Sequence, residues 1–143
     1  MSDISFENRT VIVTGAGNGL GKAYAIELGN RGAKVVVNDL GGAVDGSGSG
    51  NTPADEVVNE IISNGGEAVA NYDSVATKDG GESIVQSAID NFGTVDAVIN
   101  NAGILRDKSF AKLSEEELSL VIDVHLKGTC LLYTSDAADE ADG

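Results

Sequence analysis

Four glycines lie in a short segment, Thr14–Gly21, which follows the apolar run Val11–Val13 and opens a helix-like stretch. Glycine at positions 15, 19 and 21 removes the Cβ atoms that would block a tight turn and keep a phosphate away from backbone N–H groups. The free N–H groups at the start of a helix attract such an anion. The segment predicts a phosphate-binding turn; taken alone, a glycine turn with only a structural role is the alternative.

An acidic residue, Asp39, stands at the end of the next apolar run, Ala33–Val37. A carboxylate at the end of a strand can accept hydrogen bonds from both hydroxyls of a ribose, and its charge repels a 2′-phosphate. Its distance from the glycine turn is close to the ~20 residues expected of a dinucleotide-binding unit. Because Asn18, Leu40 and Gly41 offer no cation for an extra phosphate, we predict NAD rather than NADP. A turn-initiating aspartate before two glycines is the alternative.

Strand-like and helix-like runs alternate from residue 10 to about residue 128. Such alternation is typical of parallel strands joined by crossover helices, so we expect an α/β protein with a doubly wound parallel sheet. The expected strands are residues 10–14, 34–38, 67–71 and 95–99, and the expected helices are residues 19–31, 53–64, 79–92 and 114–129.

Two of the expected helices carry signals at their ends. The 79–92 helix repeats apolar residues at three- and four-residue spacing and precedes Gly93, which suits a left-handed cap. The 114–129 helix opens on Ser114 with Glu117 three residues later, which predicts a capping box. The glycine-rich segment Gly41–Asn51 is expected to be a solvated loop, with a flap over the ligand as the alternative.

The composition excludes several classes of protein. A chain of 143 residues suits one domain. It has neither an apolar run of ~18 residues nor the basic and apolar start of a secretory signal, so we expect an intracellular protein without a membrane span. The formal charge of −14 argues against a nucleic-acid partner, which requires a positive surface. The single cysteine, Cys130, and the single histidine, His125, predict no disulfide and no metal site.

A second motif, Asn100-Asn101-Ala102-Gly103, follows the apolar run 95–99. Together with the glycine turn and Asp39 it resembles the short-chain dehydrogenase/reductase family over residues 5–129. The resemblance implies a Rossmann fold with strand order 3-2-1-4 in this part of the chain, and an adenine pocket at Asp73-Ser74-Val75. The cofactor-binding residues expected from the motifs and the resemblance are Gly15, Asn18, Gly19, Leu20, Gly21, Asp39, Asp73, Ser74, Val75, Asn100, Ala102 and Gly103.

Four segments resemble a narrower group within this family: Asn38–Gly42, Tyr72–Val75, Gly103–Asp107 and Val124–Gly128. The group comprises (3R)-hydroxyacyl-CoA dehydrogenase parts of multifunctional β-oxidation enzymes and bacterial proteins similar to 17β-hydroxysteroid dehydrogenases. The resemblance implies hydride transfer between NAD and a secondary alcohol or ketone of an acyl thioester or steroid-like substrate. A non-catalytic NAD-binding sensor of the same fold is the alternative.

His125 stands where the family usually has an asparagine that holds a water of a proton relay. The narrower group tends to carry histidine at this position, so the residue favours that group and leaves its part in the relay open. A single histidine on a partly apolar helix also fits hydrogen-bonded packing, so both interpretations stay open.

The family's proton donor, a tyrosine with a lysine four residues later, has no counterpart among the 143 residues, because none of the three tyrosines has a lysine at that spacing. We therefore expect residues 1–129 to be the N-terminal half of a dinucleotide-binding domain, inactive alone. Residues 130–143 resemble adapter sequence read in frame, so we expect a non-native tail. The resemblance also implies a homo-oligomeric parent protein in the cytoplasm, or in the peroxisomal matrix if eukaryotic.

Overall fold

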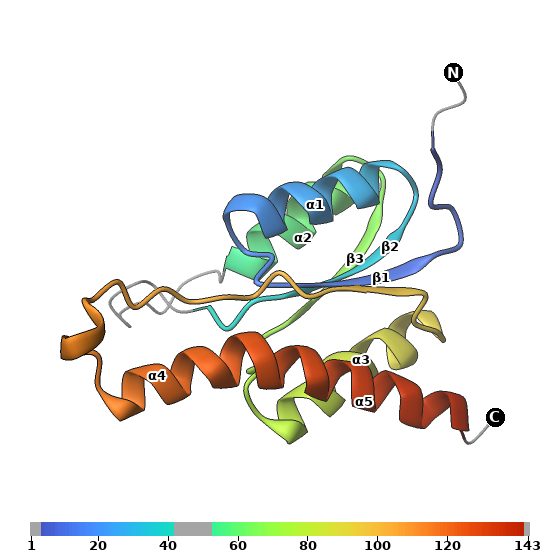
Figure 1. Ribbon diagram of the computed structural model, residues 1–143. Helices are drawn as coiled ribbons and strands as arrows, with labels where there is room; N and C mark the ends of the chain where they lie inside the picture. The colour runs from blue at the N-terminus through green and yellow to red at the C-terminus, as the bar shows by residue number, and fades with distance from the viewer. Residues whose placement is uncertain (1–3, 42–52, 142–143) are drawn as a thin grey trace.

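The computed structural model describes residues 4–41 and 53–141, in which a parallel sheet lies between two layers of helices (Figure 1). The strands are β1 (Thr10–Thr14), β2 (Lys34–Asn38), β3 (Glu67–Asn71) and β4 (Ala97–Ile99). The α-helices are α1 (Gly19–Asn30), α2 (Pro53–Ser63), α3 (Lys78–Phe92), α4 (Glu115–Ile122) and α5 (Gly128–Ala141). A 3-10 turn, η1 (Phe110–Lys112), precedes α4, and a π-helical segment, η2 (Asp123–Lys127), joins α4 to α5. Most of the predicted loop Gly41–Asn51 lies outside the described residues.

The strand order is β3-β2-β1-β4, and every neighbouring pair is parallel. This order confirms the predicted doubly wound α/β sheet. Successive residues of a strand point to opposite faces, so an unbroken apolar strand supplies two cores. Val11 and Val13 of β1 lie in the core under α1 and α2, whereas Ile12 lies in the core that faces α3 and α5.

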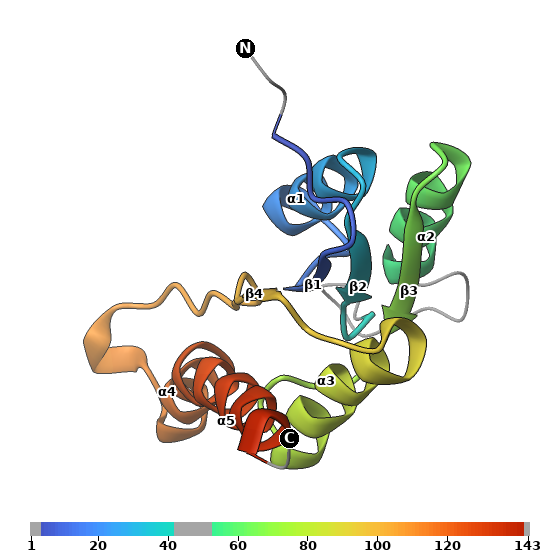
Figure 2. The same cartoon turned by 90° about the vertical axis from the view of Figure 1, so that its right-hand side faces the viewer.

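Helices cover both faces of the sheet (Figure 2). On one face, Ala25 of α1 and Val57 of α2 are buried against β1 and β2. On the other, Ile84 of α3 and Leu132 of α5 are buried against the same strands. Complete burial of one such aliphatic side chain stabilises a protein by roughly 1.5–3 kcal/mol, so both layers are needed to keep the strand ends in place.

Both predicted helix signals are confirmed. Gly93 adopts a φ of +82° after α3, and its N–H donates to the carbonyl of Ile89. Ser114 and Glu117 form the capping box at the start of α4. The bounds of the first three helices and first three strands agree with the predicted ones to within one residue, the usual uncertainty of element ends.

β4 is shorter than predicted, since it begins at Ala97 rather than at residue 95. The reason is Asp96, whose carboxylate accepts the N–H of Thr10 at 2.8 Å while its own N–H donates to the carbonyl of Thr10 at 2.9 Å. A side chain therefore takes the place of the first ladder hydrogen bond between β1 and β4.

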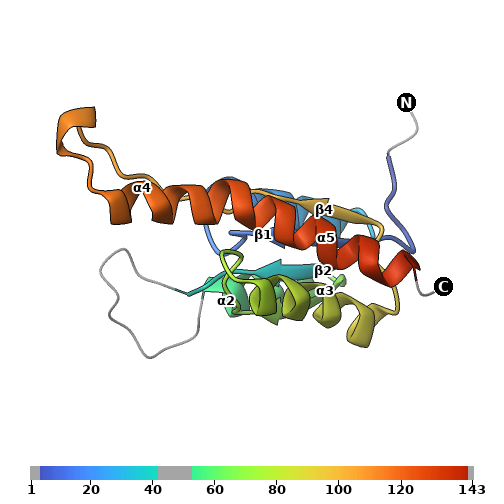
Figure 3. The ribbon, with the colours of Figure 1, turned by 60° about the horizontal axis from the view of Figure 1, so that its bottom comes forward.

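The prediction of a helix over residues 114–129 is wrong in two respects. A π-helical segment interrupts the α-helix, and the helix continues past residue 129. α4, η2 and α5 form one continuous rod that runs past residue 129 (Figure 3). Leu132 is fully buried in the second core, and a Cβ atom at Gly81 of α3 would lie 3.3 Å from the Cβ of Leu131, so α5 packs closely on α3. The foreign origin of residues 130–143 stays a prediction. No helix in the described ranges is both long and apolar enough to cross a membrane.

Candidate cofactor-binding site

The first three strands end level with one another, and each ends in a buried polar residue. Thr14 pairs in register with Asn38, and Asn38 pairs with Asn71. Their exposed fractions are 1%, 2% and 5%. We call Thr14, Asn38 and Asn71 the strand-end row. Open parallel sheets bind ligands outside the carboxyl ends of their strands, which is the edge that this row marks.

The glycine turn begins directly after Thr14 and packs tightly on itself. Gly15 has a φ of +62°, and a Cβ atom there would lie 2.8 Å from the Cα of Ala102. A Cβ atom at Gly21 would lie 2.2 Å from the carbonyl oxygen of Gly15. Both positions therefore require glycine, because any side chain would force the turn apart.

Gly19 has a different environment from the other glycines of the turn. Its φ is +56°, and a Cβ atom there would meet none of the described residues within 4 Å. Asn18, Gly19 and Leu20 are all exposed, and the Asn18 side chain makes no capping hydrogen bond. The first N–H groups of a helix have no partners within it, so the start of α1 offers donors to an anion outside the sheet.

Asp39 turns back toward the glycine turn. Its Oδ2 accepts the N–H of Gly17 at 2.9 Å, and its Oδ1 accepts the N–H of Gly41 at 3.0 Å. A carboxylate has about four acceptor sites, so Asp39 is anchored and can still accept further hydrogen bonds. A Cβ atom at Gly17 would lie 2.8 Å from Oδ2, so this glycine, which the sequence motif left unassigned, allows the turn and the acid to meet.

Asn101, which the sequence analysis did not single out, joins the second motif to the glycine turn. Its Nδ2 donates to the carbonyl oxygens of Thr14 at 3.0 Å and Gly15 at 3.1 Å. The Thr14 hydroxyl in turn accepts the N–H groups of Asn101 and Ala102. Asn100 is exposed, and its contact with the cofactor stays a prediction. The spacing of the motif does not indicate which side chain reaches the turn.

The predicted adenine-pocket residues follow β3 at the same edge. Asp73 is exposed, and its Oδ2 accepts hydrogen bonds from Asn71 at 3.0 Å and Ser83 at 2.6 Å. Ser74 is half-buried, and its hydroxyl accepts the N–H of Ala76. Val75 is 8% exposed and belongs to the second core. The backbone here thus passes from the surface to the core within three residues.

His125 lies in η2 and contacts the end of the second motif. Its Nε2 is 3.0 Å from both the backbone N and the carbonyl O of Ile104, so the tautomer decides whether it accepts or donates. A Cβ atom at Gly103 would lie 2.6 Å from the Cε1 of His125. π-Helical turns widen a helix and are frequent at functional sites; here the widened segment carries the imidazole that packs against Gly103.

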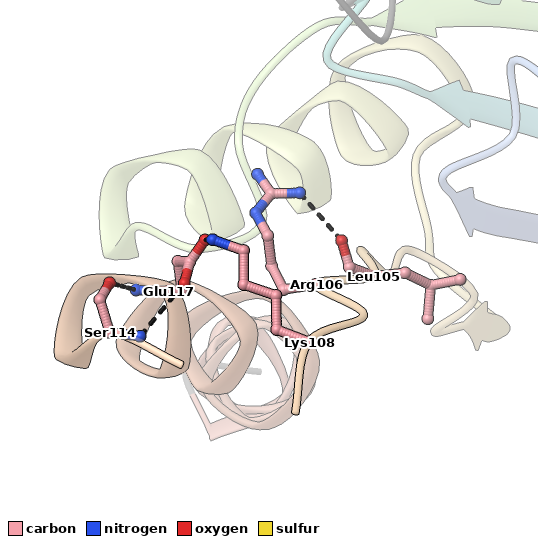
Figure 4. Close-up of polar contacts among 5 residues, drawn as sticks. All are labelled: Leu105, Arg106, Lys108, Ser114 and Glu117. Atoms are coloured by element: carbon pink, nitrogen blue, oxygen red, sulfur yellow. Dashed lines mark hydrogen bonds and ion pairs between the residues drawn. The ribbon is translucent and has the colours of Figure 1, made fainter. Parts of the chain in front are cut away.

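The segment after Ile104 is fastened to α4 by charged groups (Figure 4). The Lys108 ammonium pairs with the Glu117 carboxylate, and the Arg106 guanidinium donates to the carbonyl of Leu105 at 2.9 Å. Lys108 and the N–H of Ser114 hold the pKa of Glu117 below its ordinary value. This pair fixes the segment that leads away from the site.

Among the described residues, no group of three histidine, cysteine or acidic side chains is placed to bind a metal ion. The polar groups at the edge of the sheet are instead backbone N–H donors at the start of α1 and the carboxylates of Asp39 and Asp73. Such an arrangement can receive a phosphate and hydrogen-bond the hydroxyl or amino groups next to it.

Comparison with known proteins gives matches over most of the chain. A family model described as short chain dehydrogenase matches residues 9–139. The chain is 60% identical over 126 residues to the peroxisomal hydratase-dehydrogenase-epimerase of Saccharomyces cerevisiae. It is 54% identical over 128 residues to the peroxisomal multifunctional enzyme type 2 of Mus musculus.

The chain spans only part of each relative. The two curated matches cover 88% and 90% of this chain but 14% and 17% of those proteins. A crystal structure of a short chain dehydrogenase from Mycobacterium avium matches with a TM-score of 0.85 and 49% identity, over 92% of this chain and 46% of that one. The family match includes the glycine turn, Asp39, the second motif and His125, and the chain therefore belongs to the short-chain dehydrogenase family.

Proposed function

We propose that this chain binds the adenosine diphosphate part of NAD at the carboxyl edge of its sheet. The observation that carries the proposal is the 2.9 Å hydrogen bond from the N–H of Gly17 to Oδ2 of Asp39. This contact sets the turn that would receive the diphosphate beside the carboxylate that would receive the ribose hydroxyls. The proposed contact residues are Gly15, Asn18, Gly19, Leu20, Gly21, Asp39, Asp73, Ser74, Val75, Asn100, Ala102 and Gly103.

The anchoring of Asp39 supports NAD over NADP. Two backbone N–H groups hold its carboxylate, so it cannot swing aside without losing both hydrogen bonds. A 2′-phosphate would then lie beside a fixed negative charge, and residues 38–41 supply no lysine or arginine to offset the repulsion.

The complete protein, in this proposal, interconverts a secondary alcohol and a ketone on a 3-hydroxyacyl-CoA or hydroxysteroid substrate. Support comes from family membership and from 54–60% identity to proteins named as a hydratase-dehydrogenase-epimerase and a multifunctional enzyme. When bound, the nicotinamide accepts or donates the hydride. His125, beside Gly103 and Ile104, would orient a water that serves the proton transfer.

The 143 residues alone are proposed to bind without turnover. Residues 1–129 would form the N-terminal half of the dinucleotide-binding domain, and no tyrosine here has a lysine four residues later to act as proton donor. Assembly of the parent protein into a homo-oligomer through α4 is supported by the 39–45% exposure of Leu118, Leu120 and Ile122. The proposed compartment is the cytoplasm; the names of the relatives favour the peroxisomal matrix as the alternative.

An assay of NADH formation tests the activity. The protein encoded by the complete source gene is incubated with NAD and either a (3R)-3-hydroxyacyl-CoA, its (3S) isomer or a hydroxysteroid, in parallel with the 143-residue chain. We expect the complete protein to form NADH with the (3R)-3-hydroxyacyl-CoA or with the hydroxysteroid. We expect the 143-residue chain to form none. NADH formation by the chain itself would contradict its proposed inactivity.

A non-catalytic NAD sensor is the second candidate, since the glycine turn and Asp39 serve binding equally well without chemistry. A complete protein that binds NAD but reduces none of it with any of the three substrates would favour the sensor.

A further inference from the structure

The chain contains two asparagines that are followed directly by glycine, in the pairs Asn18–Gly19 and Asn64–Gly65. An asparagine in this position can lose its side-chain amide, because the backbone nitrogen of the next residue can attack the side-chain carbonyl carbon. Glycine favours this attack, since it has no Cβ atom to hinder the approach and its backbone rotates freely. The two pairs have the same chemistry, so their surroundings decide which of them reacts.

The Asn18–Gly19 pair lies at the start of α1, where few contacts restrain it. Both residues are exposed, and the Asn18 side chain makes no capping hydrogen bond. Gly19 is the first residue of α1, so its N–H has no acceptor within the helix. A Cβ atom at Gly19 would meet none of the described residues within 4 Å. Within the described part of the chain, the attacking nitrogen and the side-chain amide are therefore both accessible.

The Asn64–Gly65 pair, which follows α2, is also exposed but is held by hydrogen bonds. The N–H of Gly65 donates to the carbonyl of Ile62 at 2.9 Å, and the N–H of Asn64 donates to the carbonyl of Glu60 at 3.1 Å. Nδ2 of Asn64 donates to Oδ1 of Asn30 at 3.2 Å. Attack by the nitrogen of Gly65 must first break the hydrogen bond that this nitrogen donates, so this pair should react more slowly.

We propose that Asn18 is a site of spontaneous deamidation, and that the carboxylate formed there closes the glycine turn to a diphosphate. The nitrogen of Gly19 forms a bond to Cγ of Asn18, the bond from Cγ to Nδ2 breaks, and the amide leaves as ammonia with the proton that Gly19 gives up. Water then opens the cyclic imide at either of its carbonyls. The product is aspartate, or isoaspartate where the chain continues through the side-chain carbonyl, and nothing is oxidised or reduced.

A negative charge at residue 18 is expected to change binding more than folding. The start of α1 offers N–H donors to an anion, and a carboxylate at the residue before the helix would compete for these donors and repel a phosphate. Gly17, the preceding residue, already donates to Asp39, so a second carboxylate would join Asp39 at this turn. The helix itself tolerates the change, since aspartate is among the best N-cap residues. The effect on binding rests on the proposed function.

Peptide mass spectrometry measures the reaction directly. The 143-residue chain is kept in mildly alkaline buffer, which favours loss of the proton from a backbone amide, and samples are digested briefly with trypsin. Cleavage after Arg9 and Lys22 places Asn18 in a peptide with no other asparagine. We expect Asn18 to react at least about fivefold faster than Asn64, the effect of one hydrogen bond on a rate. Saturating NAD should slow the reaction at Asn18 and leave that at Asn64 unchanged.

Three variants test the effect of the charge on binding. Asn18→Asp reproduces the aspartate product, and calorimetry should show NAD binding at least about tenfold weaker than in the unchanged chain, with no fall in the urea midpoint. Asn64→Asp is the matched control, because it adds the same charge at the other pair and should leave the affinity for NAD unchanged. Asn18→Ser keeps a capping side chain but cannot form the imide, so its own affinity should not fall during an incubation that weakens binding by the unchanged chain.

Each result has a separate meaning for the two proposals. If Asn18 reacts no faster than Asn64, the deamidation site is overturned. If Asn18→Asp binds NAD as tightly as the unchanged chain, the effect of the charge is overturned. In both cases NAD binding stands. If the unchanged chain binds no NAD, the proposed function fails and the effect on binding fails with it, while mass spectrometry still decides whether Asn18 reacts.

Discussion

Glycine is required in the phosphate turn for two separate physical reasons, and substitution can distinguish them. At Gly21 the reason is space, since a Cβ atom would lie 2.2 Å from the carbonyl oxygen of Gly15. At Gly19 it is backbone conformation, because φ is +56° with no described neighbour within 4 Å. A ligand in contact with Gly19 would also require glycine there for binding. A measurement of stability alone would not detect that third requirement.

The first prediction concerns Gly21→Ala. We expect a loss of roughly 1–3 kcal/mol in the free energy of unfolding, typical of forced overpacking, together with loss of NAD binding. Gly65→Ala is the matched control, because its φ of +89° costs roughly 1–2 kcal/mol without touching the site. Urea denaturation and NAD titration measure both. A Gly21→Ala protein as stable as the unchanged chain would contradict the packing described for the turn.

Sequence spacing located the turn, Asp39 and the second motif at strand ends, and the structure brings these segments into contact. Sequence spacing did not indicate that Asn101 holds the glycine turn, because that contact depends on which side chain points toward Thr14. Sequence spacing also did not indicate Asn38 and Asn71, because their hydrogen-bond partners lie on different strands and helices. Their one sequence signal is a polar residue that ends each of two apolar strands.

At the scale of elements, the attachment of β4 depends on Asp96. Its carboxylate binds the N–H of Thr10 and the Arg9 guanidinium, and these two contacts hold its pKa below the ordinary value of 3.8. A carboxyl whose pKa is lowered by folding stabilises the native state above its unfolded pKa, and that stabilisation is lost as the pH falls through the folded pKa.

The second prediction follows from this shift. Asp96→Asn should unfold at lower urea concentration than the unchanged chain at pH 7, and the difference should shrink as the pH is lowered below about 4. Asp90→Asn, on the exposed end of α3, is the control and should shift the midpoint little. A difference that persists unchanged to the lowest pH would show that the Asp96 charge has no part in holding β4.

The third prediction concerns the capping box of α4. Ser114→Ala removes the hydroxyl that accepts the N–H of Glu117 at 3.2 Å and should cost roughly 1 kcal/mol of stability. Ser119→Ala, at an exposed position inside α4, should be neutral or slightly stabilising because alanine is the better helix former. Thermal unfolding followed by circular dichroism compares them. Equal midpoints for the two variants would mean that the cap does not stabilise the helix.

The first three helices and the parallel sheet followed from apolar periodicity, and the strand order followed from the family resemblance, but the joint between α4 and α5 followed from neither. A π-helical segment has the same sequence pattern as the α-helix around it, and here it coincides with the contact of His125 and Ile104, which are far apart in sequence. The shortening of β4 likewise depends on the tertiary contact of Asp96. Apolar periodicity reports only the local preference of a segment for helix or strand. It therefore cannot predict features that depend on tertiary contacts.

For the whole molecule, the important fact is how much apolar surface is exposed at and beyond β4. β4 is an edge strand, and the segment beyond it exposes Leu105 at 76%, Phe110 at 92% and Leu126 at 63%. Unpaired strand edges and exposed apolar groups promote association. We therefore expect the isolated chain to aggregate at concentrations where a closed domain would not.

The fourth prediction tests this surface. Phe110→Glu should reduce light scattering on concentration and leave the urea midpoint unchanged, since the ring packs against little of the protein. Ala111→Glu adds the same charge at the neighbouring exposed position without removing apolar surface, and should reduce scattering less. Equal effects of the two variants would assign the change to net charge rather than to Phe110.

The most direct measurement of the central proposal is a pair of calorimetric titrations of the chain with NAD and NADP, repeated on Asp39→Asn. We expect NAD to bind at least about tenfold more tightly than NADP, because the fixed carboxylate repels a 2′-phosphate, and we expect the substitution to narrow that ratio. NADP binding as tight as NAD binding, or a ratio that the substitution leaves unchanged, would contradict the assignment of Asp39 and of the glycine turn it touches.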